Sequence, residues 1–351
     1  MMITGAELFV KALKAEQVDT LFAYPGGQAI DLFNALYGEQ DIDVILPRHE
    51  QGLVHAADGY ARSTGKVGVC LVTSGPGATN LVTGIATANY DSVPLVCFTG
   101  QVPTGLIGND AFQEVDIVGI TRSICKYAVT VRKREELAAV IRKAFLISRT
   151  GKPGVVVVDL PKDIQREYGS DDYPEEIEIR GYKPKLSVHP GQLKKALETL
   201  NHAKKPVFLV GGGVNISHAH SEMLKLAEMT GVPVVTTIMG KGAIPTTHDL
   251  YIGNLGIHGS YAANTAISHC DVLFSIGTRF NDRITGKTGH FATHAAIIHI
   301  DIDPASISRN IEVDIPIVAD AKTALLALLE KAQKLDTEEW LEQIRQWKSQ
   351  Y

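Results

Sequence analysis

Residues 67–90 read VGVCLVTSGPGATNLVTGIATANY and are the clearest indication of the fold class. The run Val67–Thr73 is short and apolar, which predicts a buried strand, while Ala78–Tyr90 has the spacing of a helix. The glycines and the proline between them predict a tight turn from strand to helix. Repeated units of this kind are typical of a parallel sheet with helical crossovers.

The same alternation extends to both sides of this unit. Predicted helices cover Gly5–Glu16, Gln28–Tyr37, Gln51–Arg62 and Glu135–Thr150, and predicted strands cover Thr20–Tyr24, Val44–Leu46, Pro94–Thr99 and Val155–Leu160. The four successive valines Val155–Val158 are typical of a strand that is buried on both faces. Residues 1–165 are therefore expected to form a doubly wound α/β domain.

The pattern stops after this domain and then resumes. Residues 166–187 are crowded with acids, tyrosines and prolines, which predicts a surface linker. A second α/β domain is expected over 188–335, with helices at Gly191–His202 and Ser221–Thr230 and strands at Pro206–Val210, Val232–Thr237, Val272–Ile276 and Ile297–Ile302. Residues 336–351 predict an amphipathic helical tail with Trp340, Ile344, Trp347 and Tyr351 on one face, which needs a cover. We expect that cover to come from a further domain.

Composition narrows the class of protein. The chain has 351 residues, is 45% hydrophobic and 21% charged, and carries a net charge of -5, as expected for two folded domains. It has no basic block for nucleic acid and no apolar stretch of the roughly 18 residues that a membrane span needs. Its cysteines are widely spaced and predict reduced core residues. A cytoplasmic protein is therefore expected, with neither nucleic acid nor membrane as partner.

Two segments at strand ends in the first domain are candidates for chemistry. Glu50 follows the strand Val44–Leu46 and precedes the helix Gln51–Arg62, so it lies where open α/β sheets bind ligands and is a candidate catalytic acid. An acid in a first helical turn also complements the helix dipole, and the local sequence alone favours this structural interpretation. The turn Thr73–Asn80 could offer backbone amides to a ligand, or could simply be a tight turn.

The second domain has its own strand-end candidates. Gly211–Gly213 follow one predicted strand, and Asp301 ends another, as an acid that binds a ribose hydroxyl does. Three glycines are more often a plain turn. Arg279 and Arg283 follow a third strand and could bind phosphate, or could form surface ion pairs. The histidines, including His290 and His294, form no metal-ligand motif, so no metal is expected in this chain.

Taken together, the segments resemble one family, the large catalytic subunits of acetohydroxyacid synthase (acetolactate synthase), which are thiamine-diphosphate enzymes. The resemblance runs from Thr4 to about Leu335. It rests on an ordered set of motifs, namely Tyr24–Gly27, Arg48–Gly52, Gly59–Arg62, Ser74–Asn80, Phe98–Pro103, Asp110–Glu114, Asp116–Ile120, Asp159–Asp163, Gly211–Gly213, Gly256–Gly259 and Arg279–Gly286.

The resemblance implies a domain architecture and a set of cofactors. It implies a pyrimidine-binding domain for thiamine diphosphate over 1–165, a central FAD-binding domain over 188–335, and a third domain that binds the diphosphate through Mg²⁺ with a Gly-Asp-Gly motif. This sequence contains no Gly-Asp-Gly. It is therefore expected to hold the first two of three domains, with the diphosphate-binding domain absent, and to be inactive by itself.

The resemblance also implies roles for single residues. Glu50 would hydrogen-bond a pyrimidine ring nitrogen and so activate the cofactor, Gln113 would orient the substrate, and Gly27 would offer its amide to the reacting carbonyl. Phe112, Lys162 and Arg279 would line the substrate tunnel. The residues implied to bind cofactors are Pro76, Asn80, Gly212, Gly213, His258, Gly259, Arg279, Asp282, Arg283, Asp301 and Asp320.

The implied reaction is the decarboxylating condensation of pyruvate with pyruvate or 2-ketobutyrate, in branched-chain amino acid biosynthesis. A homo-oligomer, dimer or tetramer, and a small regulatory subunit are the implied partners. Two alternatives stay open: a flavin-free catabolic acetolactate synthase, and a non-catalytic flavin-binding module of the same fold. Glu50, Gln113 and Lys162 favour an enzyme, and the segments around Gly212 and Arg279 favour the flavin-binding branch.

Overall fold

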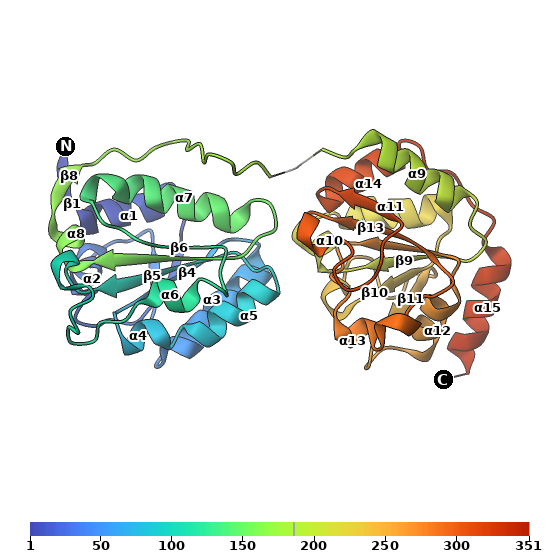
Figure 1. The fold of residues 1–351 in the computed structure, drawn as a ribbon, viewed down its shortest axis with the longest axis horizontal. Helices are drawn as coiled ribbons and strands as arrows, with labels where there is room; N and C mark the ends of the chain where they lie inside the picture. Colours follow the sequence, from blue (N-terminus) through green and yellow to red (C-terminus); the bar gives the residue numbers. More distant parts are fainter. Residues whose placement is uncertain (185–186, 351) are drawn as a thin grey trace. The chain divides into compact units, whose positions relative to one another are not determined.

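The chain forms two units, Met1–Lys183 and Pro184–Tyr351. The structure, a computed structural model, describes residues 1–184 and 187–350. Each unit holds a six-stranded sheet in which all strand pairs are parallel (Figure 1). This confirms the predicted doubly wound α/β fold. No helix within the described ranges combines the length and the apolar character needed to span a bilayer.

The sheet of the first unit is ordered β3-β2-β4-β5-β7-β6. Its strands are β2 (Thr20–Ala23), β3 (Asp43–Ile45), β4 (Gly68–Val72), β5 (Leu95–Gln101), β6 (Tyr127–Thr130) and β7 (Val155–Pro161). The helices of this unit are α1 (Gly5–Ala15), α2 (Ile30–Leu36), α3 (Glu50–Thr64), α4 (Pro76–Thr79), α5 (Val82–Tyr90), α6 (Ile117–Thr121), α7 (Leu137–Arg149) and α8 (Lys162–Arg166).

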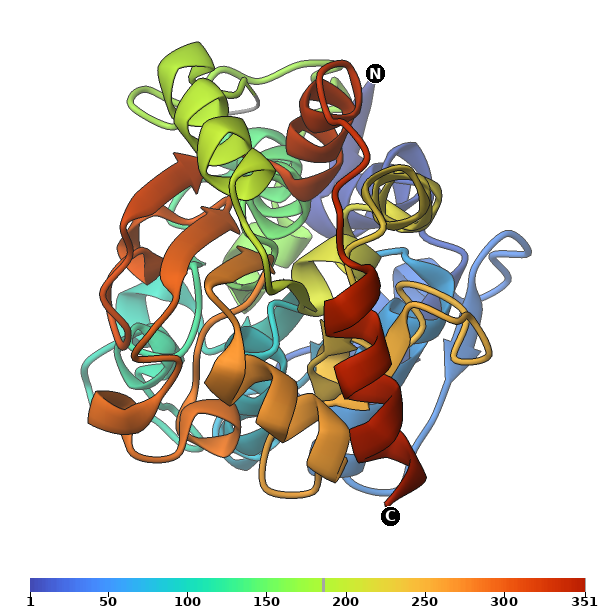
Figure 2. The same ribbon diagram turned by 90° about the vertical axis from the view of Figure 1, so that its right-hand side faces the viewer.

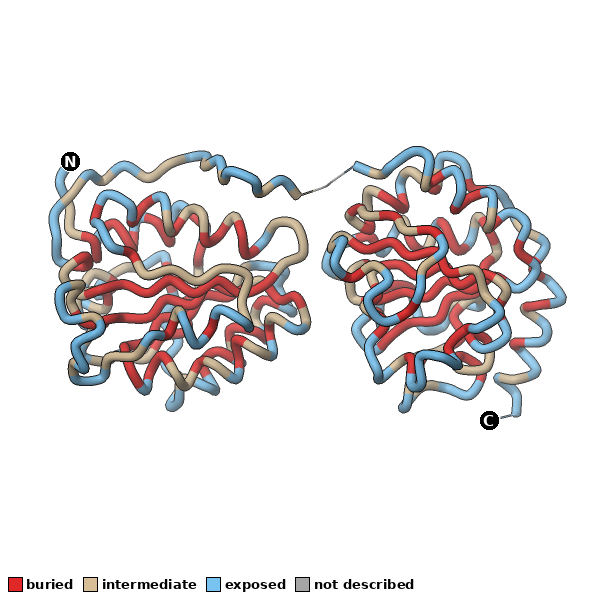
Figure 3. The backbone as a smooth tube through the Cα atoms, in the orientation of Figure 1, coloured by how far each residue is buried: buried red, intermediate tan, exposed pale blue. Residues whose placement is uncertain are grey.

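Strand β7 shows why its sequence is apolar throughout. Val156 and Val158 belong to the core that also contains Phe9 of α1 and Phe145 of α7. Val155 and Val157 belong to the core on the other face, together with residues of α3 and α5. In Figure 1, α1 and α7 lie on one side of this sheet and α3 to α6 on the other. Figure 3 shows the central strands between them, β4, β5 and β7, as buried.

The structure adds a small antiparallel sheet that the sequence did not predict. It pairs β1 (Met2–Thr4) with β8 (Tyr168–Ser170), which lies inside the segment expected to be a linker. Further along this segment, Tyr173 packs on the core of the first unit and donates a hydrogen bond to Glu16 Oε1 at 2.8 Å. Much of the segment 166–187 is therefore attached to the first unit; its residues 185–186 lie outside the described residues.

The second unit has the strand order β11-β10-β9-β12-β13-β14. Its strands are β9 (Pro206–Val210), β10 (Val234–Thr236), β11 (Tyr251–Asn254), β12 (Val272–Ile276), β13 (Ala296–Asp301) and β14 (Ile315–Val318). Its helices are α9 (Pro190–Asn201), α10 (Gly212–Ile216), α11 (His220–Thr230), α12 (Tyr261–His269), α13 (Asp282–Thr285), α14 (Ala321–Leu329) and α15 (Glu338–Ser349).

The final helix, α15, has its cover within the same unit. Trp340 is only 2% exposed, and its indole Nε1 donates to the Pro206 carbonyl at 3.1 Å. Trp340 and Ile344 share a core with residues of α12, and Figure 2 shows α15 beside α12. The expectation that a further domain covers this helix is therefore wrong for Trp340 and Ile344. Tyr351, assigned to the same face, lies outside the described residues.

Candidate functional site

The candidate site of the first unit lies where the chain changes direction across its sheet. From β2 the chain continues to β3 on one side, and β4 is followed by β5 on the other, so the strand order reverses between β2 and β4. Open α/β sheets bind ligands in the crevice outside the carboxyl ends of strands at such a point, and this region is called the β2/β4 crevice below. The loops that follow these strands meet there. Gln28 N donates to Thr73 Oγ1 at 3.2 Å, and a Cβ on Gly26 would lie 2.5 Å from Thr73 Cβ. Such close approach requires glycine at position 26.

Glu50 faces this crevice from the first turn of α3. Asn80 Nδ2 donates to Glu50 Oε2 at 2.9 Å, which fixes the carboxylate in orientation. Glu50 Oε1 lies 3.4 Å from where a Cβ on Gly77 would stand. Oε2 is thus hydrogen-bonded within the protein, while Oε1 lies beside Gly77, which has no side chain. The sequence predicts one helix over Ala78–Tyr90, but it is interrupted at Asn80–Leu81, and Asn80 turns toward Glu50.

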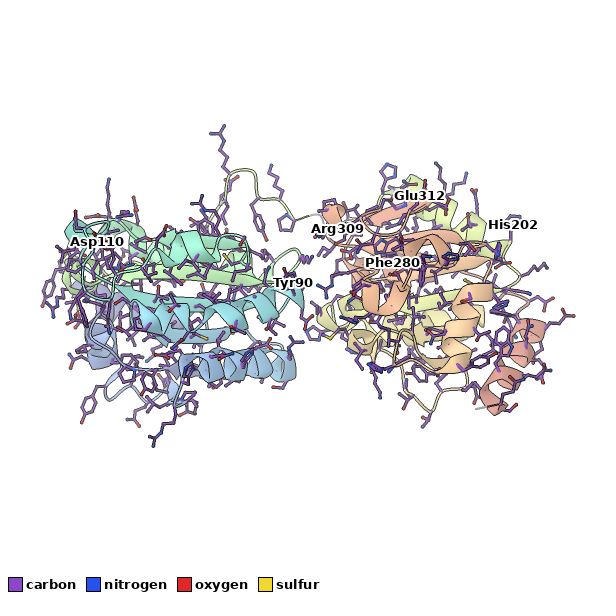
Figure 4. The ribbon with its side chains drawn as sticks, turned by 60° about the horizontal axis from the view of Figure 1, so that its bottom comes forward. Tyr90, Asp110, His202, Phe280, Arg309 and Glu312 are labelled. Atoms are coloured by element: carbon purple, nitrogen blue, oxygen red, sulfur yellow. The ribbon has the colours of Figure 1, made fainter. Side chains whose placement is uncertain are left out.

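Gln113 reaches the same loop from the segment after β5. A Cβ on Gly75 would lie 2.6 Å from the Gln113 carbonyl oxygen, so the two backbones pack directly against each other. Both residues have positive φ, +59° at Gly75 and +57° at Gln113. The neighbouring Phe112 is 83% exposed. Figure 4 shows Asp110, in the same segment, and Tyr90 at opposite ends of this unit, so the segment lies at the strand ends where the crevice opens.

Lys162 joins the site from the end of β7. Its Nζ donates to the Gly27 carbonyl at 2.6 Å, which fixes the peptide after Gly27 in the loop that follows β2. Glu50, Gln113, Gly27 and Lys162 therefore all lie on segments that follow parallel strands of one sheet. Pro76 and Asn80 belong to the loop and helix between them.

The crevice contains polar groups that the sequence analysis did not single out. Ser74 is buried, and its Oγ has no hydrogen-bond partner; the same is true of the buried Gln28 Oε1. A buried polar atom without a partner is destabilising unless a ligand or water satisfies it. Ser74 lies within the quoted turn, so its position was visible in the sequence, but its burial was not.

The second unit has an equivalent crevice between β9 and β12, where its strand order reverses. Gly213 N donates to the Gly277 carbonyl at 3.1 Å, and a Cβ on Gly211 would lie 2.2 Å from that oxygen. Gly211 and Gly213 are thus required for the packing of the two strand-end turns against each other. Gly212 is the one whose missing side chain would point elsewhere, toward Met239 Cβ at 3.1 Å.

The polar candidates of this unit differ in their surroundings. Arg279 is half-buried, while Asp282 and Arg283 are exposed and face each other at 3.7 Å. Asp301 is buried, and its Oδ1 accepts from Asp303 N at 2.8 Å. The remaining candidates are His258, which is exposed, Gly259, which makes a tight turn against Asn254 O, and Asp320, whose carboxylate caps α14 through Thr323 N.

A buried histidine supports the turn that carries Arg279. His299 Nε2 donates to the Thr278 carbonyl at 2.7 Å, and its ring packs edge-on against Phe280, labelled in Figure 4. Burial lowers the pKa of His299 to about 4, so the ring is neutral at physiological pH. The adjacent Thr278 Oγ1 is buried without a partner. The sequence pattern did not single out His299, because a lone histidine in a mostly apolar strand is indistinguishable from a core residue until its neighbours are known.

No three His, Cys, Asp or Glu side chains within residues 1–184 and 187–350 gather as ligands of a metal ion would.

Two family profiles match the chain. The first is the thiamine pyrophosphate enzyme N-terminal TPP binding domain, over residues 3–120, and the second is the thiamine pyrophosphate enzyme central domain, over 193–328. Each profile lies within one of the two structural units. The matched regions contain both of the crevices described above.

Several curated proteins are similar along nearly the whole chain. The probable acetolactate synthase large subunit of Methanocaldococcus jannaschii is 53% identical over 98% of this chain and 59% of its own length. The acetolactate synthase isozyme 3 large subunit of Escherichia coli is 48% identical over 99% of this chain and 61% of its own length. The acetolactate synthase large subunit of Corynebacterium glutamicum is 46% identical over 99% of this chain and 56% of its own length. The chain thus spans about three fifths of these relatives.

Proposed function

Because the chain belongs to the thiamine pyrophosphate enzymes, of which it carries the N-terminal and central domains, we propose that it acts within the catalytic subunit of an acetolactate synthase. The proposed reaction condenses pyruvate with pyruvate or 2-ketobutyrate and releases CO₂. The observation that carries the proposal is the geometry of Glu50, which faces the β2/β4 crevice with one carboxylate oxygen bound to Asn80. A helix-dipole role alone does not require that contact.

The residues of the crevice suit the pyrimidine half of thiamine diphosphate. When bound, thiamine diphosphate supplies an acidic carbon that adds to the keto group of the substrate. Glu50 Oε1 would share a proton with a ring nitrogen, and Asn80 would keep the carboxylate turned toward it. Gly77 and Pro76 would form the wall beside the ring, and the buried, unpartnered Ser74 Oγ offers a further polar contact.

The neighbouring side chains would bind and orient the keto acid. Lys162 fixes the peptide after Gly27 by its hydrogen bond to the Gly27 carbonyl, and the neighbouring Gly27 N–H would hydrogen-bond the reacting carbonyl oxygen. Gln113 would orient the substrate through its side-chain amide. Phe112, which is exposed, would contribute an apolar wall to the substrate tunnel.

We propose that the second unit binds FAD across the ends of its strands. Support comes from the strand order 3-2-1-4-5-6, counted from β9, which is the order of dinucleotide-binding folds, and from Gly212 and Gly213 at its switch point. Thr278 Oγ1, buried without a partner beside the adjacent Gly211, is a polar group that a ligand could satisfy. The remaining proposed contacts are His258, Gly259, Arg279, Asp282, Arg283, Asp301 and Asp320. The flavin would be a bystander and not a redox partner.

Titration of the purified chain with FAD tests this assignment. Flavin fluorescence should be quenched on binding, and Arg279→Ala should weaken the binding at least tenfold, while Arg345→Ala on the exposed side of α15 should not. Absence of binding by the wild-type chain at high micromolar FAD contradicts the assignment and favours the flavin-free branch of the family. A chain that binds FAD but supports no carboligation in any complete enzyme favours a non-catalytic module.

The diphosphate of the cofactor and its Mg²⁺ are assigned to a region of the complete protein outside this sequence, since the relatives extend well beyond the matched residues. The chain alone should then form no acetolactate, and addition of the remaining region with thiamine diphosphate and Mg²⁺ should restore carboligation. Acetolactate formed by the chain alone, free of host enzyme, contradicts this assignment. The same proposal includes a homo-oligomer, a small regulatory subunit and a cytoplasmic location.

A further inference from the structure

The segment 102–116, between β5 and α6, carries Phe112 and Gln113 but has almost no regular structure. Only a short 3-10 turn, Thr104–Leu106, interrupts it. Asp110 and Gln113 have positive φ, +52° and +57°. Non-glycine residues hold such backbone angles only where their surroundings impose them. Side chains that fasten this segment therefore determine where Gln113 lies.

One buried side chain fastens both ends of the segment. Gln101, the last residue of β5, is 2% exposed. Its Oε1 accepts from Val102 N at 3.0 Å, and its Nε2 donates to the Val115 carbonyl at 3.0 Å. The first and the penultimate residue of the segment are thus tied to the same amide. Gln113 is two residues from the second tie.

Asp159 of β7 sets the orientation of that amide. Its Oδ2 accepts from Gln101 Nε2 at 3.2 Å and from Thr130 Oγ1 at 3.1 Å, and its Oδ1 accepts from Thr99 Oγ1 at 2.7 Å. Because Asp159 presents only acceptors, Gln101 must turn Nε2 toward it and Oε1 toward Val102. A Gln101 amide flipped by 180° would lose its contacts with Val102 N, the Val115 carbonyl and Asp159.

Packing alone does not account for a carboxylate at this position. Asp159 is 1% exposed, and its hydrogen-bond donors are neutral. Burial raises the pKa of Asp159 to about 6. Its hydrogen bonds with Thr99, Gln101 and Thr130, and more weakly the charge of Arg132, offset this only in part. An apolar side chain would avoid this penalty. The carboxylate of Asp159 is therefore unfavourable for stability, and its contribution is to orient the Gln101 amide.

Two further carboxylates hold the interior of the segment. Asp163 Oδ1 accepts from Thr104 N at 3.0 Å, near its start. Glu114 Oε1 accepts from Gly108 N at 2.6 Å. This contact closes a turn within the segment, and Gln113 lies inside that turn. At its far end, the Gln113 backbone packs against Gly75, as described above. The segment 102–116 is therefore held in one conformation by these side-chain contacts, although it has little regular secondary structure.

We propose that Asp159 and Gln101 are positioning residues for Gln113. The buried carboxylate selects one orientation of the Gln101 amide, and this amide fixes both ends of the segment 102–116, so that Gln113 is presented beside Gly75. The proposal rests on the proposed role of Gln113 in orienting the keto acid. Neither Asp159 nor Gln101 needs to touch the substrate.

Amide hydrogen exchange on the chain tests the positioning without any assay of activity. In Gln101→Leu, which keeps the side-chain volume, the Gly108 amide should exchange at least tenfold faster, although it lies far along the segment from the substitution. Amides within β7 should stay protected. Asp159→Leu should act in the same way. Asp159→Asn should retain protection, because its oxygen can face Gln101 while its NH₂ group faces the Thr99 hydroxyl.

Thr99→Val is the matched control, since it removes a buried hydrogen bond of Asp159 on the side away from Gln101. Its Gly108 amide should exchange as in the wild type. Equal protection of Gly108 in Gln101→Leu and Thr99→Val overturns the proposal, and so does equal loss in both. If Asp159→Leu fails to fold, Gln101→Leu and Asp159→Asn still decide the question.

Kinetics of the complete enzyme separate this inference from the proposed function. Gln101→Leu should lower kcat/KM by about 10- to 100-fold, as expected when a substrate-orienting group is displaced. Asp159→Asn should keep most of the wild-type kcat/KM, and Asp159→Leu should lower it as Gln101→Leu does. Loosened exchange with unchanged kcat/KM in Gln101→Leu overturns the link to Gln113. If Gln113→Ala itself has no effect on kcat/KM, the proposed role of Gln113 fails, while the exchange result still reports on the positioning.

Discussion

Replacement of Glu50 by glutamine tests the proposed activity at its central residue. The substitution is nearly isosteric, and its amide can still present an oxygen to Asn80 Nδ2, which lies 2.9 Å from Glu50 Oε2. The NH₂ group then takes the place of Oε1, beside Gly77. At that place glutamine can only donate a hydrogen bond and cannot gain or lose a proton at neutral pH.

The two interpretations of Glu50 predict different magnitudes. If Glu50 only complements the dipole of α3, its loss lowers the free energy of unfolding by about 0.3–1 kcal/mol and leaves turnover unchanged. If Glu50 is the acid/base group, turnover falls by roughly 10²- to 10⁴-fold. A fall of that size corresponds to about 3–5 kcal/mol in the activation barrier. The contact with Asn80 leads us to expect the second result.

Initial rates of acetolactate formation by the complete enzyme measure this loss, with thiamine diphosphate, Mg²⁺ and saturating pyruvate. Denaturant unfolding of the same variant measures the dipole contribution. Glu7→Gln is the matched control, because Glu7 also lies in a first helical turn and accepts from Thr4 N at 2.7 Å. It should lower stability and leave turnover unchanged. Turnover by Glu50→Gln within a few-fold of the wild type refutes the role proposed for Glu50.

Three further predictions follow from single contacts. Trp340 is buried, so the chain by itself should show blue-shifted tryptophan emission, and Trp340→Ala should lower the free energy of unfolding by about 3–5 kcal/mol; emission like that of free tryptophan contradicts the packing of α15. The pKa of Asp159, about 6, lies above that of an unfolded aspartate, so the folded state binds its proton more tightly, and stability is lost as pH rises from about 4 to about 6. In the wild type, the free energy of unfolding should fall by about 3 kcal/mol over this pH range because of Asp159, and Asp159→Asn should lack this fall. Parallel pH profiles of unfolding free energy for the two proteins would rule out the raised pKa. Gly75→Ala should lower the free energy of unfolding more than Gly38→Ala, because both glycines have positive φ but only a Cβ at position 75 would press against Gln113. Denaturant unfolding measures both losses, and equal losses contradict the contact with Gln113.

The sequence alone was sufficient for the fold class and for most of the central strands. Runs such as Val155–Val158 are apolar at every position, and such a run is stable only between two layers of helices. Short elements escaped prediction where the pattern was weak. Strand β6 (Tyr127–Thr130) is half-buried throughout, and β8 (Tyr168–Ser170) lies in a polar segment, so neither shows the periodicity of a strand buried on one or both faces.

The sequence also located the candidate loops, because functional groups in parallel sheets follow the carboxyl ends of strands. It placed Glu50 on such an end, whereas Gly27 and Lys162 were named only by the family resemblance. It could not show that Asn80 turns to Glu50, or that Lys162 reaches Gly27, since these pairs are far apart in the chain and meet only when the strands are ordered. Asp159 gave no signal as a positioning residue, because its role depends on the neighbours Gln101 and Thr99 across the sheet.

Strand order depends on tertiary packing and could not be predicted from the local sequence. Local propensity specifies that β2, β4, β9 and β12 are strands, but each could pair with several neighbours at similar local free energy. Long-range packing selects β2 beside β4 and β9 beside β12, and thereby creates the two crevices. Packing likewise covers α15 from within its own unit, where the amphipathic pattern could show only that some cover was needed. The sequence specifies which functional groups the chain carries. Whether these groups meet in one site depends on contacts between segments that are distant in the sequence.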